Sequence, residues 1–177
     1  SRIQQYFGHR GNWFYVDGTG GDDDNDGSMD HPFKTIEKAL LKANDGYANL
    51  SIGMLSAGTY TVDDYNNLTY LSLHIYSYAT DVIIDFARTD FTTYGLHLNL
   101  RGENGKLIIR SGGENGFHFE SGQLYAENVY FNFPCRIIGT NCHFRECEFD
   151  SIHASESNIV FNGALAFHNE SRVAVVV

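Results

Sequence analysis

Two acidic residues near the C-terminus, Glu148 and Asp150, have the types and spacing of a hydrolytic pair. They lie in a segment whose apolar residues alternate, so strand geometry would place both carboxylates on one outward face. The strand rise would separate their Cα atoms by about 6.6–6.8 Å, within reach of the acid–base pair of a glycosidase. An acidic chain also produces such pairs by chance, and the alternative is a non-catalytic sugar-contact patch in which Tyr125 and Tyr130 join the carboxylates.

Imidazole and guanidinium side chains recur along the same part of the chain. His74, His97 and His118 each stand between two apolar residues, and Arg136 and His153 recur at similar places. We expect all five to project outward from one sheet as a ladder that contacts sugar hydroxyls, carboxylates or a neighbouring subunit. The alternative is a set of solvated outward positions on a half-buried sheet. The predicted carbohydrate-binding residues are Tyr125, Tyr130, His97, His118, Arg136 and His153.

An acidic, glycine-containing loop near the N-terminus is a candidate calcium site. Asp22, Asp24 and Asp26 alternate and are followed by a glycine and Asp30, as in the first half of a calcium-binding loop. The position at which a glutamate should complete the coordination shell is Phe33, so Ca²⁺ would need another closing ligand. The alternative is a tight turn whose side chains bond their own backbone. We expect no other cofactor.

The three cysteines, Cys135, Cys142 and Cys147, are an odd number, so they cannot form a complete set of disulfides within the chain. They occupy positions where neighbouring repeats carry Leu, Phe or Val, which predicts buried free thiols that pack as small apolar side chains. The alternative is a zinc site formed by Cys142, Cys147, His143 and His153. Against it, the Cys-x₄-Cys spacing is poor, and alternation places His143 on the opposite face from Cys142.

The bulk composition predicts one all-β domain. The chain has 177 residues, with 13 Phe, 11 Tyr and 18 Gly but only 2 Pro, which favours a compact fold with many turns. With 12 basic and 22 acidic residues its net charge is −10, which argues against a nucleic-acid partner. No apolar run approaches the roughly 20 residues needed to span a bilayer, so we expect no membrane insertion. The chain begins at Ser1 rather than Met, from which we expect a fragment of a longer protein.

A sequence repeat runs through the C-terminal half. Residues 124–132 match 142–150 at an offset of 18, residues 159–162 follow at 17, and residues 107–110 precede at 17. A second register joins Phe117, Cys135 and Ile152 at offsets of 18 and 17. Earlier in the chain, residues 71–75 match residues 96–100 at an offset of 25. Such periods predict a parallel β-solenoid in which stacked coils bury a shared core. A β-sandwich is the competing fold.

Period-two alternation assigns the faces of these coils. We expect the apolar members of the two aligned segments to point inward, namely Leu124, Ala126, Val129, Phe131, Cys142, Phe144, Cys147 and Phe149. The polar members between them would point outward, namely Tyr125, Glu127, Tyr130 and Asn132 beneath His143, Arg145, Glu148 and Asp150. The in-register pair of Glu127 and Arg145 is then a surface ion pair.

One amphipathic helix is predicted at residues 32–45. Ile36, Ala39, Leu40 and Ala43 form one apolar stripe, Pro32 and Thr35 suit its start, and Asn44-Asp-Gly suits its end. Laid across the first coil, the stripe would cover the open end of the core. The domain is thus expected to comprise residues 1–177, with an entry strand and acidic loop at 1–31, the capping helix at 32–45 and the coils at 50–177. The apolar C-terminal run of residues 171–177 would need a further coil or another subunit to cover it.

Four segments carry a resemblance to a known family: Phe14-Tyr-Val-Asp-Gly, Asp24-Asn-Asp-Gly, Pro32-Phe-Lys-Thr-Ile-Glu-Lys-Ala-Leu and Leu55-Ser-Ala-Gly-Thr-Tyr. They resemble the entry to right-handed β-helix domains of the pectate-lyase-like superfamily, in the version common in bacteriophage tail spikes and tail fibres. The match covers roughly residues 13–62 by motif and the remainder by repeat pattern only. It implies a right-handed parallel β-helix with an N-terminal capping α-helix.

The resemblance also implies a function. It suggests a homotrimeric protein of the virion tail that acts outside the host cell, assembles with other tail proteins and binds host surface polysaccharide. The same entry sequence precedes lyases, hydrolases and non-catalytic spikes, so fold alone does not choose among them. With only five or six coils, the chain is shorter than the catalytic members, which favours receptor binding without catalysis. A polysaccharide-degrading enzyme and a structural trimerisation module are the alternatives.

Overall fold

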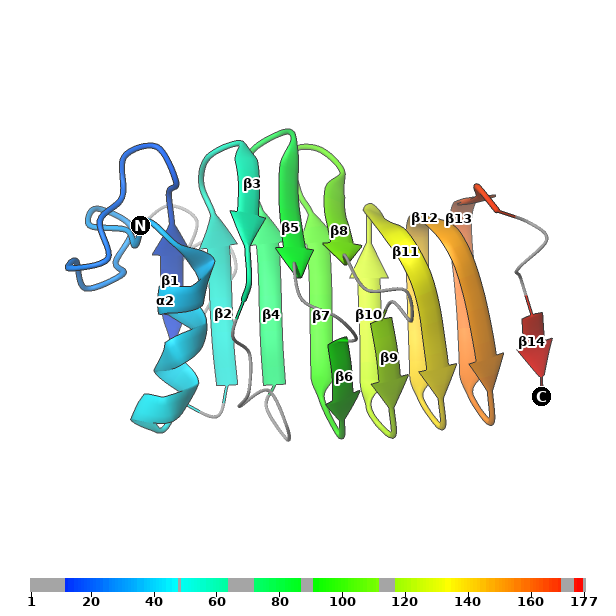
Figure 1. Cartoon of the computed structure of the whole chain (residues 1–177). Helices are drawn as coiled ribbons and strands as arrows, with labels where there is room; N and C mark the ends of the chain where they lie inside the picture. Colours follow the sequence, from blue (N-terminus) through cyan, green and yellow to red (C-terminus); the bar gives the residue numbers. More distant parts are fainter. Residues whose placement is uncertain are drawn as a thin grey trace.

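The computed structural model describes residues 12–47, 49–63, 72–86, 91–111, 117–169 and 174–176, and these form a parallel β-helix. Strands of successive coils stack side by side along one axis, with α2 at the N-terminal end and β14 at the C-terminal end (Figure 1). All pairings between the named strands are parallel, and they join into a single curled sheet of 14 strands. The solenoid predicted from the repeat is thereby confirmed, and the sandwich is not.

The curled sheet has three faces, each a stack of parallel strands. The first face contains β1 (Trp13–Val16), β2 (Asn49–Met54), β4 (Ser72–Ser77), β7 (His97–Gly102), β10 (Gln123–Glu127) and the beginnings of β12 (Asn141–Ser155) and β13 (Asn158–Phe167). The second face contains β3 (Gly58–Thr61), β5 (Val82–Phe86), β8 (Leu107–Ser111), the first half of β11 (Val129–Ile138), the middle of β12 and the end of β13. The third face contains β6 (Phe91–Tyr94), β9 (Phe117–Glu120), the second half of β11, the end of β12 and β14 (Ala174–Val176).

The register between coils confirms most of the predicted alignment. Leu124 pairs with Cys142, Cys142 pairs with Ile159, and Leu98 stands 25 residues after its partner Leu73. One alignment is wrong, because Leu107 pairs with Val129 on the second face, whereas Leu98 occupies the place next to Leu124. β7 and β8 both have alternating apolar residues, so the local sequence pattern does not show on which face each strand stacks.

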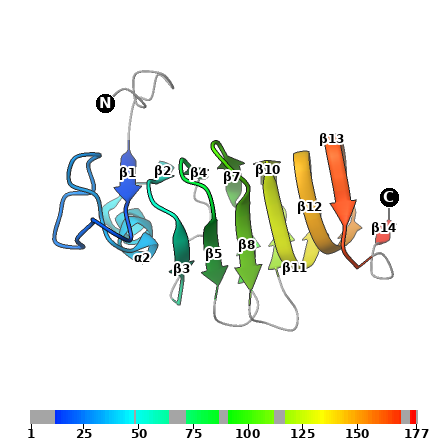
Figure 2. The same ribbon diagram turned by 90° about the horizontal axis from the view of Figure 1, so that it is seen from above.

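The core is a continuous column of stacked apolar rows that runs through all the coils. Every residue assigned inward in the two aligned repeats is buried, and every residue assigned outward is partly or fully exposed, as predicted. Aromatic rings dominate the C-terminal coils, where Phe131 stacks on Phe149 at 5.1 Å and Phe149 on Phe167 at 5.7 Å between ring centroids. Figure 2 shows the strands of successive coils following one another along this column.

The helical cap is shorter than predicted. α2 (Ile36–Leu40) continues into a 3₁₀ helix, η1 (Leu41–Asp45), and Ile36, Ala39 and Leu40 are buried in the main core. Thr35 is the N-cap, and its hydroxyl accepts from the backbone N–H of Lys38 at 3.2 Å. The helix cannot begin at residue 32, because Phe33 forms a bridge with β1. Among the described residues, no helix is long and apolar enough to cross a membrane.

Left-handed backbone conformations turn the chain at two kinds of corner, which recur in most of the coils. The corner before the first face contains Gly95, Ser121, Gly139 and Glu156, and the corner before the second face contains Asp81, Asn128, Glu146 and Gly163, all with φ between 51° and 74°. Asparagine tolerates this conformation better than most side chains. At Asn128 the side-chain amide also donates to the carbonyl of Gly102, one coil earlier, at 3.1 Å.

We predict that Asn128→Ala lowers the free energy of unfolding by about 2 kcal/mol. Roughly half of this comes from the lost hydrogen bond and half from the strain of alanine at positive φ. Asn128→Gly also removes the hydrogen bond, but glycine adopts positive φ without strain. The free energy of unfolding should therefore fall less in this variant. Urea denaturation of the three proteins measures both values, and equal losses for the two variants would contradict the conformational part.

Candidate functional site

A groove of about 480 Å³ crosses the outer surface of the first face. Its lining comes from β4, β7, β10, β12 and β13, so five successive coils contribute to it. Coils stack about 4.8 Å apart, which makes the groove roughly 19 Å long across the strands. The groove therefore spans several repeats of the solenoid rather than belonging to one motif.

The groove is built from two outward rows that the strand register aligns. The His97 row contains Ser72, His97, Gln123, Asn141 and Asn158. The His74 row contains Ser51, His74, Asn99, Tyr125, His143 and Val160. Both rows consist mainly of amide, hydroxyl and imidazole side chains, which can donate and accept hydrogen bonds without carrying a fixed charge.

His74 is the more enclosed of the two histidines at the N-terminal end of the groove. Its Nε2 lies 3.3 Å from the Ser72 hydroxyl, and its ring stacks nearly parallel to Tyr76 with 6.4 Å between ring centroids. Burial lowers the pKa of His74, and the neighbouring charge of His97 lowers it further. His97 itself is exposed at the mouth of the groove. The two imidazoles are thus electrostatically coupled across adjacent strands.

Asn99 lies next to His74 in the same row, with an unused hydrogen-bond acceptor. Its Oδ1 atom is buried and has no hydrogen-bond partner among the described residues, although the side chain as a whole is half-buried. A buried carbonyl oxygen without a partner is unfavourable by about 1–3 kcal/mol. A donor supplied by a ligand, or by a protonated neighbour, would remove this cost.

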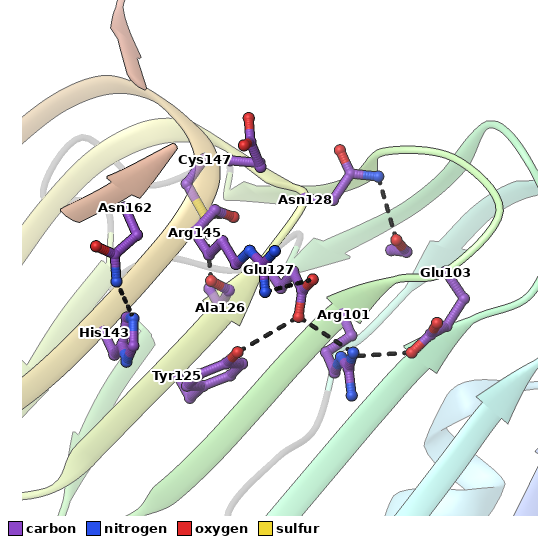
Figure 3. A network of polar contacts seen from close by, with 12 residues as sticks. Arg101, Glu103, Tyr125, Ala126, Glu127, Asn128, His143, Arg145, Cys147 and Asn162 are labelled. Carbon is purple, nitrogen blue, oxygen red and sulfur yellow. Dashed lines mark hydrogen bonds and ion pairs between the residues drawn. The ribbon is translucent and has the colours of Figure 1, made fainter. Parts of the chain in front are cut away.

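A third outward row, the Arg101 row, borders the groove and holds it in place through a charge network. This row contains Tyr76, Arg101, Glu127, Arg145 and Asn162. Figure 3 shows Glu127 between the two arginines, with Arg101 Nη2 at 3.1 Å and Arg145 Nη1 at 3.9 Å from its carboxylate oxygens. The predicted ion pair of Glu127 and Arg145 is confirmed, and Arg101 is a second and closer partner that sequence reasoning missed.

The network also positions the aromatic residue of the groove. The Tyr125 hydroxyl donates to Glu127 at 3.3 Å, and the Tyr125 ring lies 5.2 Å from the His143 ring in an edge-on arrangement (Figure 3). Burial raises the pKa of Tyr125, and the charge of Glu127 raises it further, so the phenol keeps its proton. The His143 Nε2 in turn contacts the amide nitrogen of Asn162 at 2.6 Å.

An aromatic cluster outside the main core supports the N-terminal end of the Arg101 row. The Trp13 ring stacks on Tyr15 at 5.7 Å and on Tyr76 at 5.2 Å, and all three residues are buried. The Arg101 guanidinium lies 5.9 Å from the centre of the Tyr76 ring, within the range of a cation–π contact. This second cluster fixes the arginine from the side opposite Glu127.

The predicted carbohydrate-binding residues lie on three different faces. Tyr125 and His97 both line the first-face groove, whereas Tyr130 lies on the second face. His118, Arg136 and His153 form the expected ladder, but on the third face. The prediction of one ladder including His74 and His97 is therefore wrong, because β4 and β7 stack on the first face and β9 on the third.

Glu148 and Asp150 share the outward side of β12 on the second face, and both are already engaged by neighbours. Glu148 forms an ion pair with Lys106 at 2.9 Å. Asp150 accepts hydrogen bonds from the Tyr130 hydroxyl and from the Asn132 amide. The cavity beside Glu148 measures about 140 Å³, far less than the first-face groove. The hydrolytic pair stays a hypothesis, without a saccharide-sized cavity beside it in the described part of the chain.

The acidic loop is organised by carboxylates that accept backbone hydrogen bonds. Asp22 accepts from the N–H of Asp24 at 3.0 Å, and Asp26 accepts from that of Ser28 at 2.9 Å, which holds the pKa of Asp26 below its ordinary value. In the described ranges, no three His, Cys, Asp or Glu side chains are grouped so as to hold a metal ion. Calcium binding by Asp22, Asp24, Asp26 and Asp30 stays a prediction.

Asp23, which the calcium pattern passed over, connects this loop to the cap. Its carboxylate accepts from the backbone N–H groups of Lys34 and Thr35 at 3.0 and 2.9 Å and from the Thr35 hydroxyl at 2.8 Å. These contacts hold the residue that caps α2. The acidic loop thus has a structural role, and it is carried by Asp23, a residue that sequence reasoning did not single out.

The three cysteines are buried free thiols, as predicted. Burial raises the pKa of Cys142 to about 12 and that of Cys147 to about 11, and it also raises the pKa of Cys135. Cys147 donates to the carbonyl of Ala126 at 3.4 Å inside the core. His143 points outward into the groove, so it does not share a face with the thiols that a zinc site would need.

We predict that iodoacetamide at pH 8 modifies none of the three thiols in the native protein. At a pKa of about 11, roughly one Cys147 thiol in a thousand is ionised at that pH, and its burial also blocks access. In guanidinium chloride all three should react. Mass spectrometry after timed quenching counts the adducts, and rapid labelling of the native protein would contradict the packing of these residues.

Comparison with known proteins identifies one family model. Residues 19–67 match the family described as "Protein of unknown function (DUF1565)". The match covers the acidic loop, α2, η1, β2 and β3, which is less than a third of the chain. Neither the comparison with curated proteins nor that with solved structures yields a match. The family match and the curled sheet of parallel strands both fit a β-helix fold.

Proposed function

We propose that this chain is the receptor-binding domain of a bacteriophage tail fibre or tail spike, which binds host surface polysaccharide without cleaving it. The observation that carries the proposal is the first-face groove, with its lining of amide, hydroxyl, imidazole and phenol groups. Such groups suit the hydroxyls of sugars, and an aromatic ring offers an apolar face to a sugar ring. The viral context is taken from the resemblance of the entry segments, and a location on the virion tail, outside the host cell, is part of the proposal.

The length of the groove supports a polymeric ligand. Five coils contribute to its lining, and each adds outward side chains at the same two row positions. A chain of sugars running parallel to the solenoid axis would meet a comparable set of groups at every coil. A homotrimer, contacts with other tail proteins and avidity from several such grooves are part of the same proposal.

The proposal includes the absence of catalysis. The observations behind this part concern Glu148 and Asp150 on the second face. Glu148 is paired with Lys106, and Asp150 is hydrogen-bonded to Tyr130 and Asn132. A hydrolytic pair needs one carboxyl free to donate a proton to the leaving group and space for a sugar between the two. Enzymatic degradation and a purely structural trimerisation module remain the alternatives for the experiment to exclude.

We predict that Tyr125→Ala weakens polysaccharide binding at least tenfold, which corresponds to about 1.4 kcal/mol. The variant removes the aromatic face and the phenol from the middle of the groove. Binding is measured by titration against purified host surface polysaccharides, with released reducing or unsaturated ends assayed in the same samples. Thermal melting of the variant checks that the fold is intact.

Tyr130→Ala is the matched control, because it removes the same side chain from the second face. It should leave binding unchanged. Release of product by the native chain would contradict the non-catalytic function and favour a polysaccharide-degrading enzyme. Glu148 and Asp150 would then be the residues to mutate. Binding to no polysaccharide would leave the structural module, and equal losses for the two tyrosine variants would contradict the position of the site.

A further inference from the structure

The outward rows of the first face contain few carboxylates for such an acidic protein. The whole chain carries 22 acidic and 12 basic residues, yet Glu127 is the one carboxylate in the three outward rows defined above, where it faces two arginines. The groove lining contains no carboxylate among the described residues. A polyanionic ligand would be repelled by most of this acidic surface but not by the first face. The charge distribution of the first face is therefore compatible with an anionic ligand in this groove.

Three histidines line the groove, and two of them, His74 and His97, lie near each other at its N-terminal end, whereas His143 lies two strands farther along. His74 and His97 come from adjacent strands and both line the groove, and the charge of His97 lowers the pKa of His74. Protonating both places two like charges together, which is unfavourable in the empty groove. An anion bound between them would offset that repulsion, so anion binding and protonation must favour each other.

We propose that the groove binds a carboxylate-bearing saccharide through the protonated imidazoles of His74 and His97, and therefore binds more tightly as the pH falls. The inference rests on the proposed saccharide-binding function and names the chemical class of its ligand and the condition that regulates it. Asn99 supports the proposal, because its buried Oδ1 is an unused acceptor beside His74. A protonated imidazole donates from both nitrogens, whereas a neutral one donates from only one.

The surroundings of the pair contain few other groups that titrate. On the neighbouring strand β2, the residues opposite Ser72 and His74 are Asn49 and Ser51, and neither is ionisable. The ionisable or charged groups near the pair on β4, β7 and β10 are Tyr76, Arg101, Tyr125 and Glu127, and Glu103, directly after β7, forms a further ion pair with Arg101 at 3.4 Å. Burial raises the pKa of both tyrosines, so neither loses its proton near neutral pH. Histidine is the side chain whose ordinary pKa lies between pH 5 and 8, and the histidines that line the groove are His74, His97 and His143.

The sign of the pH effect follows from the direction of the shift. Because the pKa of His74 lies below the ordinary histidine value of about 6.5, the empty groove gains this charge only in mildly acidic solution. A sugar carboxylate stays ionised down to about pH 4–5. Affinity should therefore rise as the pH falls from 8 to 5, by about tenfold for each histidine whose pKa the ligand raises by one unit.

The experiment uses three polymers with one backbone: carboxymethyl-dextran, dextran sulfate and unmodified dextran. Each is titrated into the protein at pH 5.0, 6.5 and 8.0 and constant ionic strength. We expect carboxymethyl-dextran to bind at least tenfold more tightly at pH 5.0 than at 8.0, and dextran to show no pH dependence. The double variant His74→Gln with His97→Gln should lose this gain.

His153→Gln is the matched control, because it removes an exposed histidine from the third face. It should keep the gain, which separates the groove from the general loss of negative charge at low pH. A flat profile in the native protein, or an unchanged gain in the double variant, would overturn the inference. So would dextran sulfate binding with carboxymethyl-dextran not binding, since the ligand would then not be a carboxylate.

The outcome is distinguishable from failure of the proposed function. If host polysaccharides bind with a Tyr125-dependent affinity that is independent of pH and of His74 and His97, the adhesin stands and the anion inference fails. If no polysaccharide and none of the three polymers binds, the proposed function itself fails.

Discussion

The in-register pairing of parallel strands between successive coils is the interaction on which the rest of the structure depends. It brings the same position of each coil to the same place, so side chains form rows along the solenoid axis. Inward rows, such as Leu73, Leu98 and Leu124, make a continuous core. Outward rows make a groove without any local motif. A shift of one residue in register would exchange the two sets.

The correctly predicted features of the fold are those that depend on the alternation of apolar and polar residues within one strand. The inward and outward assignments in residues 124–132 and 142–150 are confirmed, because a period of two is visible within a single strand. The misplaced alignment of Leu107 shows the limit, since the face on which a strand stacks depends on where the chain turns. Those turns include Ser121 and Glu156, which adopt positive φ although neither is glycine or asparagine. Composition gives no signal for them, and at Ser121 the backbone N–H donates to the carbonyl of Ile138 in the next coil, a contact between residues far apart in the sequence.

The candidate site was predicted only in part for the same reason. Tyr125 and His97 were singled out as sugar-binding residues, and the structure brings them into one groove. Asn99 was missed, because an isolated asparagine between leucines carries no pattern of its own. Its importance comes from its neighbour in the preceding coil, His74, which is 25 residues away in the sequence. Functional surfaces of a solenoid are thus non-local, and a single sequence reveals them only after the register between coils is known.

Amide hydrogen exchange with and without bound host polysaccharide is the most direct measurement of where the ligand binds. If the first-face groove is the site, added protection will fall on peptides from β7, β10 and the beginning of β12, and peptides from β9 and the end of β12 will exchange as before. Protection confined to the second or third face, in a sample where binding is saturated, would contradict the assignment of the groove.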